Sequence, residues 1–335
     1  MKRRWLSLLL AGCLLLLTGC GQSTQPIPES TIAPGVDTLL PSPGEAQTMD
    51  LHGEATLWFR FLTEPYLAPE TRIITQQSGQ SYEMALLSAL FAGPGTQQPE
   101  LSGMFPEGTR VLSTVRQGRT LLVTVSAAFL QPLPDQPGDW NSDEAWQIEA
   151  PLRRRLAMQS LVATVTENCD VDEVLVLVDQ GRRAENSLRL RQSWFLDGSD
   201  DSVLTGPQTR DDRLLLSPTV TADALLGCWL QRDWARLYRY VAASDPLTGV
   251  SRPSYDDFVQ EMEALPPLLR AACGGSAVAA NGLIATCTIT ASLGVRGGQI
   301  ERGARVIRLH RANGLWKVSF SQLTGWLEGD YGAAQ

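Results

Sequence analysis

The chain has 335 residues, of which 43% are hydrophobic, and it carries a formal net charge of −8 at pH 7. This composition is typical of folded globular domains, and the length predicts about two of them. Nucleic-acid phosphates attract Lys and Arg, so an acidic chain has no electrostatic reason to bind them. We therefore expect no nucleic acid among its partners.

The first twenty residues have the pattern of an export signal. Lys2, Arg3 and Arg4 precede an apolar run over 5–17, which is shorter than the roughly 20 residues that a membrane-spanning helix needs. The run closes with Leu-Thr-Gly-Cys, which resembles a bacterial lipobox with cleavage between Gly19 and Cys20. An ordinary signal peptide or a buried apolar helix are the alternatives. The resemblance implies that Cys20 carries lipid, palmitate included, and fixes the protein to the extracytoplasmic face of the cell membrane.

Residues 20–54 differ in composition from the rest of the chain. They hold five prolines, several Ser, Thr and Gln, and no Lys or Arg. Such a segment is expected to form a disordered tether, and its 30 or so residues reach on the order of 30 Å by the square-root rule. Removal of residues 1–19 takes away three of the 28 basic residues and none of the 36 acidic ones, which leaves a formal charge of −11. The anchor must then be lipid, because the mature chain offers no polybasic help.

A first folded unit is predicted over residues 55–181. Its patterns alternate between β-branched runs and segments with helical spacing. The predicted elements are strands over 56–62 and 72–75, a helix over 82–90 capped by Ser81, strands over 110–115 and 121–125, a helix from Asp143 to Thr166 with a kink or restart at Pro151, and a buried strand over 174–178. This order predicts an α+β fold of one sheet and two helices.

Motifs in this unit resemble the GerMN domain. The helix ending in Leu90-Phe91-Ala92-Gly93-Pro94 is similar to the family's "L-L-x-G-P" element, and residues 105–112 to its "I-P-x-G-T-x-V-L" turn and strand. Residues 161–166 and 171–179 resemble the closing elements, although Gln180 separates Asp179 from Gly181 where the family has Asp-Gly. The resemblance implies a role in sporulation or spore germination, in assemblies of the cell envelope.

A polar connector over 182–218 leads to a second predicted α+β module over 219–330. A helix capped by Asp223 and continuing to Val241, and a second helix over 255–265, precede strands over 283–293, 305–309 and 315–320. Asn313-Gly314 is a strong hairpin signal. Helices followed by a curved antiparallel sheet resemble SnoaL-like or cystatin-like cones.

Four of the six cysteines lie in the predicted domains. Cys169, Cys228, Cys273 and Cys287 allow three pairings, and Cys273 with Cys287 is the easiest because the two are close in sequence. The alternative is four buried free thiols, which a chain with real cores tolerates.

The sequence offers few candidates for a catalytic or metal-binding site, and neither catalytic nor metal-binding residues nor cofactors are expected. His310 follows a strand alternation and is predicted at the surface or rim. Residues 197–201 lack the EF-hand pattern, and 170–173 are expected to form a polar turn. Arg153-Arg154-Arg155 either dock an anionic polymer or, more simply, lie on a solvated helix face. Core packing is expected to explain most of the nine tryptophans.

The sequence thus predicts a non-enzymatic lipoprotein that serves as a binding or assembly module. Its expected partners are the membrane, through lipid on Cys20, and an envelope protein or the cell wall. The rival hypothesis is a small-ligand carrier or an envelope enzyme that uses the C-terminal cone. Polar residues gathered around His310 would favour an enzyme, and a cone filled with apolar side chains would count against both.

Overall fold

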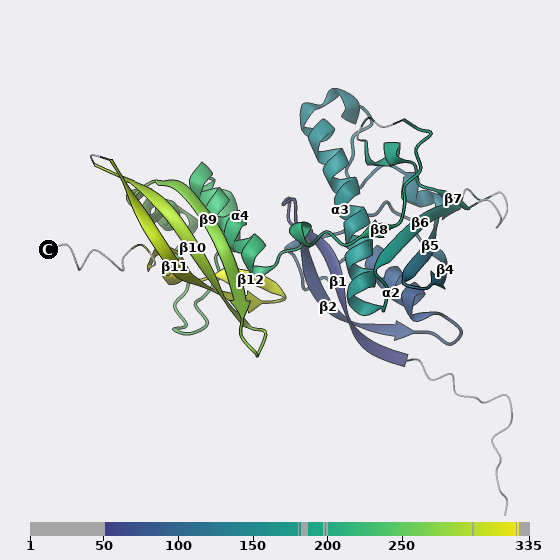
Figure 1. The fold of residues 1–335 in the computed structure, drawn as a ribbon, viewed down its shortest axis with the longest axis horizontal. Coiled ribbons are helices and arrows are strands. Elements are labelled where there is room, and N and C mark those ends of the chain that lie inside the picture. Colours follow the sequence, from purple (N-terminus) through teal and green to yellow (C-terminus); the bar gives the residue numbers. More distant parts are fainter. Residues whose placement is uncertain are drawn as a thin grey trace, which may run out of the picture. The chain divides into compact units, whose positions relative to one another are not determined.

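The computed structural model describes residues 51–179, 181, 187–196, 198, 200–296, 298–325 and 327. These residues all belong to one compact unit, Thr48–Gln335. Figure 1 shows two groups of elements in chain order, an N-terminal domain from β1 to β8 and a C-terminal module from α4 to α7. No helix among the described residues is long and apolar enough to cross a membrane.

Two sheets build the N-terminal domain, where the sequence predicted one. The first has the order β2-β1-β3 and is antiparallel, and the second has the order β4-β5-β6-β7 with β8 paired to β6. The strands are β1 (Leu51–Phe61), β2 (Leu67–Gln76), β3 (Leu101–Ser102), β4 (Val111–Gln117), β5 (Thr120–Ser126), β6 (Glu173–Asp179), β7 (Ser187–Arg189) and β8 (Gln208–Thr209). β1 begins four residues before the predicted start at Ala55, because its first residues pair with the end of β2.

Both predicted helices of this domain are present. α2 (Tyr82–Phe91) begins at Ser81, whose side chain accepts a hydrogen bond from the Met84 amide as an N-cap. α3 (Glu144–Asn168) begins at Asp143 in the same way and continues through Pro151 without a restart. α3 connects β5 to β6, which pair in parallel as a crossover connection allows. β6 is buried along most of its length, as its unbroken apolar run predicts.

Helix α3 satisfies part of the backbone edge of β1. Ser160 donates its hydroxyl hydrogen to the Trp58 carbonyl at 2.6 Å, and the Trp58 amide donates to the Thr164 hydroxyl at 3.0 Å. One turn further on, Asn168 exchanges hydrogen bonds of 2.9 and 2.8 Å with the backbone of Thr56. Side chains four residues apart share one helix face, so a row of small polar residues takes the place of a neighbouring strand. This row fixes the first sheet to α3 and joins the two sheets into one core.

Helices come first in the C-terminal module, as predicted, but their boundaries differ. α4 (Pro218–Gln231) begins at Ser217 rather than at Asp223, and it ends at Arg232, which adopts a left-handed conformation with φ of 55°. Asp233 then caps a separate α5 (Trp234–Tyr240), so one predicted helix is two. α6 (Tyr255–Ala264) lies where the sequence predicts it.

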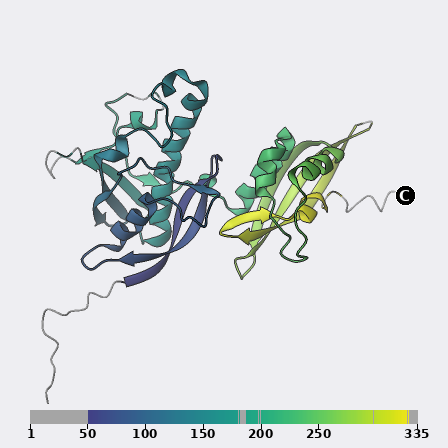
Figure 2. The ribbon, with the colours of Figure 1, turned by 180° about the vertical axis from the view of Figure 1, so that it is seen from behind.

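A four-stranded antiparallel sheet of order β12-β11-β10-β9 completes the module (Figure 2). The remaining elements are β9 (Leu268–Val278), β10 (Ile284–Val295), β11 (Gly298–Ala312), β12 (Leu315–Val318) and α7 (Phe320–Gly325). β9, which the sequence did not predict, continues past Gly274-Gly275, and its register with β10 shifts there between the Gly275–Thr288 and Cys273–Ile289 pairs. Asn313 and Gly314 both have positive φ, 51° and 83°, as the predicted hairpin between β11 and β12 requires.

The inner face of this sheet is filled. Alternate residues of β10, among them Ala285, Cys287 and Ile289, are fully buried, while Thr286 and Thr288 between them are exposed. Large apolar side chains from the helices, such as Trp229, complete the core. The module is α+β, with helices packed against one face of its sheet.

The N-terminal domain and the C-terminal module meet at a buried ion pair. Glu64 is 2% exposed and accepts three hydrogen bonds of 2.5 to 2.8 Å from the guanidinium of Arg236. The Tyr240 hydroxyl donates to the same carboxylate at 3.0 Å. A backbone hydrogen bond of 2.8 Å from the Leu216 amide to the Leu67 carbonyl also joins the segment before α4 to β2.

Candidate binding site

A pocket beside β7 combines an apolar floor with arginine side chains. Its volume is about 380 Å³, within the range of roughly 300 to 1,000 Å³ that is typical of ligand sites. The residues that line it come from α3, β6, β7 and the segments on either side, namely Leu130, Arg154, Val178, Leu188, Arg189, Leu190, Arg191, Ser193, Trp194 and Leu204. We call it the β7 pocket.

Trp194 anchors the floor of the β7 pocket. Its ring stacks on Phe129 with centroids 5.1 Å apart and meets Phe195 edge-on at 4.9 Å. A short 3-10 helix over Gln192–Phe195 presents this tryptophan, and Leu196 ends the turn in a left-handed conformation with φ of 57°. Stacked and edge-on aromatic contacts fix ring orientation, so the floor is a rigid surface.

Arg154 brings a positive charge to this floor. It lies on α3, its guanidinium donates to the Trp194 carbonyl at 2.6 Å, and it sits 5.5 Å from the centre of the Trp194 ring. No described carboxylate forms an ion pair with it. Burial therefore lowers the pKa of Arg154, since a desolvated cation without an anion is costly. The two neighbouring arginines of the run differ, because Arg153 pairs with Glu149 and Arg155 with Asp211.

Arg189 and Arg191 add two more cations along the wall of the pocket. They alternate with Leu188 and Leu190, and both arginine side chains are exposed. Arg191 donates to the backbone carbonyl of Asp201, and among the described residues neither arginine forms an ion pair with a carboxylate. The pocket thus gathers three guanidinium groups in a chain whose net charge is −8.

Exposed leucines extend the apolar surface around the pocket. Leu188 and Leu204 are each about half exposed, at 50% and 49%, and Leu130 is 38% exposed. Apolar surface next to unpaired guanidinium groups is the chemistry that a ligand with both carboxylate and apolar groups requires. Ser193 also lines the pocket, and its hydroxyl donates a hydrogen bond to the Asp201 carboxylate.

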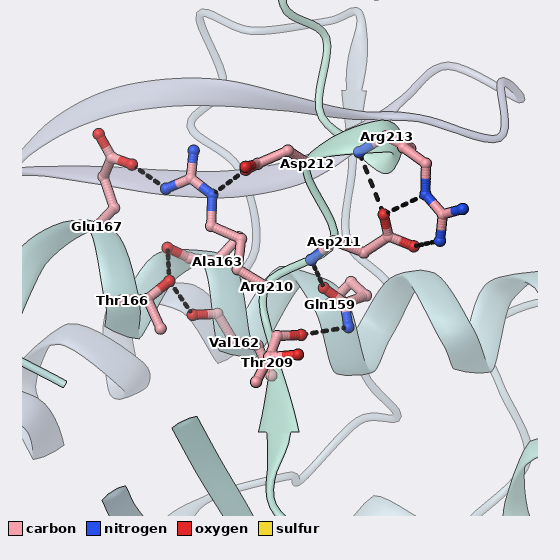
Figure 3. A network of polar contacts seen from close by, with 10 residues as sticks. All are labelled: Gln159, Val162, Ala163, Thr166, Glu167, Thr209, Arg210, Asp211, Asp212 and Arg213. Carbon is pink, nitrogen blue, oxygen red and sulfur yellow. Dashed lines mark hydrogen bonds and ion pairs between the residues drawn. The ribbon is translucent and has the colours of Figure 1, made fainter. Parts of the chain in front are cut away.

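A larger groove of about 800 Å³ lies on another part of α3, between Pro151 and the connector around Arg210. Figure 3 shows that two of its arginines, Arg210 and Arg213, are paired with carboxylates. Arg210 pairs with Glu167 and Asp212, and Arg213 bonds both oxygens of Asp211 at 2.9 and 3.0 Å. The Arg213 guanidinium is the main cause that lowers the pKa of Asp211 to about 2.

Gln159 fastens the connector to α3 in the same groove. Its side chain donates to the Thr209 carbonyl at 3.1 Å and accepts from the Asp211 amide at 2.9 Å (Figure 3). These contacts hold β8 beside β6. The polar residues of this groove therefore have a structural role, which is to hold the connector against α3. We find no such role for the arginines of the β7 pocket.

The predicted site residues have different outcomes. Gly19 and Cys20 lie outside the described residues, so the lipid anchor stays a prediction. Cys273 and Cys287 carry free thiols on neighbouring strands. The two thiols are close enough to form a hydrogen bond, and burial is the largest of the causes that raise the pKa of Cys287 to about 12. A disulfide between them stays a prediction as well.

The surface position predicted for His310 is wrong. The residue is 6% exposed, and its Nε2 has no hydrogen-bond partner among the described residues. It lies opposite Lys317 in the β11–β12 pairing, and Lys317 is already bonded to Glu100 and to the Arg239 carbonyl at 2.7 and 2.6 Å. Lys317 is therefore bonded to groups other than His310. Burial lowers the pKa of His310 and is the largest influence on it.

The acidic segments have structural roles where they are described. Asp170 and Asp172 pair with Arg119 at the turn before β6, as predicted. Asp197 and Ser199 lie outside the described residues, whereas the Asp200 carboxylate accepts from the Ser202 amide at 2.9 Å in a turn. Among the described residues no group of His, Cys, Asp and Glu is arranged to hold a metal ion.

Of the two hypotheses for Arg153–Arg155, the preferred solvated helix face fits Arg155, which is exposed, whereas Arg153 and Arg154 are half-buried. The sequence also missed Arg189 and Arg191, which it placed in the polar connector. The strict alternation Leu188-Arg189-Leu190-Arg191 is the signal that could have found them, because alternation is typical of a half-buried strand.

Comparison with known proteins supports the assignment of the N-terminal domain. Residues 61–183 match the model of the Germane family, described as sporulation and spore germination. The chain carries a domain of the Germane family. The match begins at the last residue of β1 and covers β2 to β6 with α2 and α3, and it confirms the resemblance to GerMN domains. No curated protein matches the chain.

Two solved structures are similar to parts of the chain. The tandem GerMN domains of the sporulation protein GerM from Bacillus subtilis align with 15% identity and a TM-score of 0.31 over 51% of this chain and 49% of that one. The chain thus spans about half the length of that structure. A candidate lipoprotein from Clostridium perfringens aligns with 17% identity and a TM-score of 0.27 over 49% of this chain and 89% of that one.

Proposed function

We propose that the protein is an exported lipoprotein that acts as a binding module in sporulation or spore germination at the cell envelope. The observation that carries this proposal is the Germane-family match over 61–183. The β7 pocket, most of whose residues follow that region, adds cations and apolar surface. The lipobox-like sequence ending in Cys20 supplies the anchor, and the basic-free segment after it supplies the reach. The C-terminal module contributes a filled α+β core.

Processing of the chain in a spore-forming host tests the anchor. Cys20→Ser is expected to release the protein from the membrane fraction or to leave it unprocessed, because the acylated thiol is lost. Cys13→Ser is the matched control, since Cys13 lies within the part that the signal peptidase removes. Normal processing and unchanged membrane fractionation of the Cys20→Ser chain would rule the anchor out.

The role itself is tested by deletion of the coding sequence. We expect the deleted strain to form fewer heat-resistant spores or to germinate more slowly, with the phenotype restored by the intact chain. Normal counts and normal germination would contradict the role. Enzymatic activity is not part of the proposal.

A further inference from the structure

We propose that the β7 pocket binds an extended acidic segment of a protein partner, with an apolar side chain on Trp194 and carboxylates on Arg154, Arg189 and Arg191. This inference deepens the proposed function, on whose binding role it rests. It specifies where the partner binds and what chemistry the partner must have.

The charges of the β7 pocket complement those of an acidic ligand. Most arginines of the N-terminal domain are paired, as in the groove around Arg210. The three arginines of the β7 pocket form no direct ion pair with a described carboxylate, although the charge of Arg191 also acts on Asp200. Arg154 in particular keeps a half-buried cation against an aromatic ring. A carboxylate that reached it would gain a charge-assisted hydrogen bond in a partly desolvated site, where such bonds are strong. The pocket therefore favours an anionic ligand.

Spacing along the strand favours an extended peptide. Arg189 and Arg191 are two residues apart, which corresponds to about 7 Å in a strand. Acidic side chains at alternate positions of an extended segment have the same separation. β7 also occupies an end of its sheet and pairs with β6, whereas the backbone around Arg191 already pairs with Leu204. The edge offered to a peptide is therefore that of β7 itself, and such an edge is a common place for a peptide to add a strand.

The size of the β7 pocket suits the apolar side chains of a peptide. A volume of about 380 Å³ admits a few apolar side chains, and Leu188 and Leu204 continue the apolar surface on either side of Trp194. A lipid headgroup would need cations that converge on a single point, whereas these three cations are distributed over α3 and the strand segment. A protein segment with alternating acidic and apolar residues matches both features.

Fluorescence anisotropy with a labelled peptide tests the inference. The probe is a nine-residue peptide that alternates Leu and Glu, and the matched probe replaces each Glu by Gln. The protein is residues 21–335, with both the domain and the module present. We expect the Leu/Glu peptide to bind at least about tenfold more tightly than the Leu/Gln peptide, and its affinity to fall as salt rises.

Variants of exposed residues locate the binding site without threatening the fold. Arg189→Gln with Arg191→Gln is expected to weaken binding of the Leu/Glu peptide by about tenfold or more. Arg270→Gln is the matched control, since its side chain is 81% exposed on β9 and the charge change is the same per site. It is expected to leave affinity within about twofold.

Several outcomes would overturn the inference. These are no binding at millimolar peptide, equal affinity for the two peptides, or an equal loss with Arg270→Gln. Vesicles of phosphatidylglycerol that bind through Arg189 and Arg191 when the peptide does not would assign the pocket to lipid. A chain of residues 48–335 that binds the peptide far more tightly would assign it to the acidic segment before Leu51. Normal sporulation of the deletion strain bears on the proposed function alone, because the binding assay does not depend on it.

Discussion

Arg154 and Trp194 form the centre of the β7 pocket. The guanidinium donates to the tryptophan carbonyl at 2.6 Å and lies 5.5 Å from the ring centre, without a carboxylate among the described residues to balance it. α3 supplies the arginine and a short 3-10 helix supplies the tryptophan, 40 residues apart in sequence. We expect the Arg154 guanidinium to stabilise a bound anion more than it stabilises the fold.

Arg154→Met tests that distinction. We expect it to abolish binding of the acidic peptide but to change the free energy of unfolding by only about 1 kcal/mol, since replacement of a poorly compensated buried charge by an apolar side chain is often neutral. Urea denaturation followed by circular dichroism gives the stability.

Arg60→Met is the matched control for Arg154→Met. The Arg60 side chain is 3% exposed, pairs with Glu149 and donates to the carbonyls of Thr63 and Glu64. Its loss leaves these acceptors without their donor, although Arg153 still pairs with Glu149, and is expected to cost about 3 kcal/mol. Equal losses of stability in the two variants would make Arg154 a structural residue and remove its role in the pocket.

The Glu64–Arg236 ion pair is expected to be strongly coupled. Arg236→Met leaves a carboxylate that is 2% exposed without its cation, and we expect a loss of about 3 kcal/mol in the free energy of unfolding. Glu64→Gln together with Arg236→Met should recover much of that loss, because no buried charge then remains. A double-mutant cycle by urea denaturation measures the coupling, and additive single effects would contradict it.

Asp245 predicts how stability depends on acid. Hydrogen bonds from the Leu247 amide, then from the Ser321 hydroxyl, hold its pKa at about 2, below the ordinary 3.8. A pKa that is lower in the folded chain gives stability that is present above about pH 4 and is lost as the pH falls toward 2. Asp245→Asn should therefore be less stable at pH 6 and decline less steeply between pH 4 and 2.

Thermal melts at each pH check the Asp245 prediction. Asp256→Asn, an exposed aspartate on α6, controls for the loss of one negative charge. Parallel acid-unfolding curves for the wild-type chain and Asp245→Asn would show that these hydrogen bonds add no acid-sensitive stability.

The cysteines differ in reactivity. Burial is the leading cause that raises the pKa of Cys228 and of Cys287 to about 12, so their thiols should resist iodoacetamide at pH 8 in the native chain, because the thiolate is the reactive form. Cys273 is half-buried and should react first. Mass spectrometry of the labelled peptides gives the order.

Mild oxidation tests the predicted disulfide. We expect it to link Cys273 to Cys287, which lie on paired strands. Cys273→Ser should leave the other three thiols unlinked. A crosslink that involves Cys169 or Cys228 would contradict this pairing.

Local patterns predicted most elements of the fold. The Ser81 and Asp143 caps, the buried run of β6 and the Asn313-Gly314 hairpin each depend on neighbours in sequence, and the structure confirms them. The break between α4 and α5 was missed, because the apolar stripe continues past Asp233 while the backbone turns at Arg232.

Long-range arrangements were beyond the sequence. The division of the N-terminal strands into two sheets depends on Ser160, Thr164 and Asn168 bonding to β1, which no local pattern reveals. The β7 pocket likewise depends on residues from α3 and from the chain after β6 that meet only in the folded chain. In the sequence, its arginines cannot be told apart from solvated surface residues. Only the folded structure shows which of them form ion pairs with carboxylates.

Photo-crosslinking in sporulating cells tests the central claim most directly. A photoreactive residue in place of Leu188, at the rim of the β7 pocket, is expected to give a crosslink to one envelope protein through an acidic, apolar segment. The crosslink should disappear when Arg189 and Arg191 are changed to Gln, and the same residue at Val306, which is 60% exposed on β11, should give no such product. A crosslink from Val306 instead, or one from Leu188 that survives the arginine changes, would contradict the account.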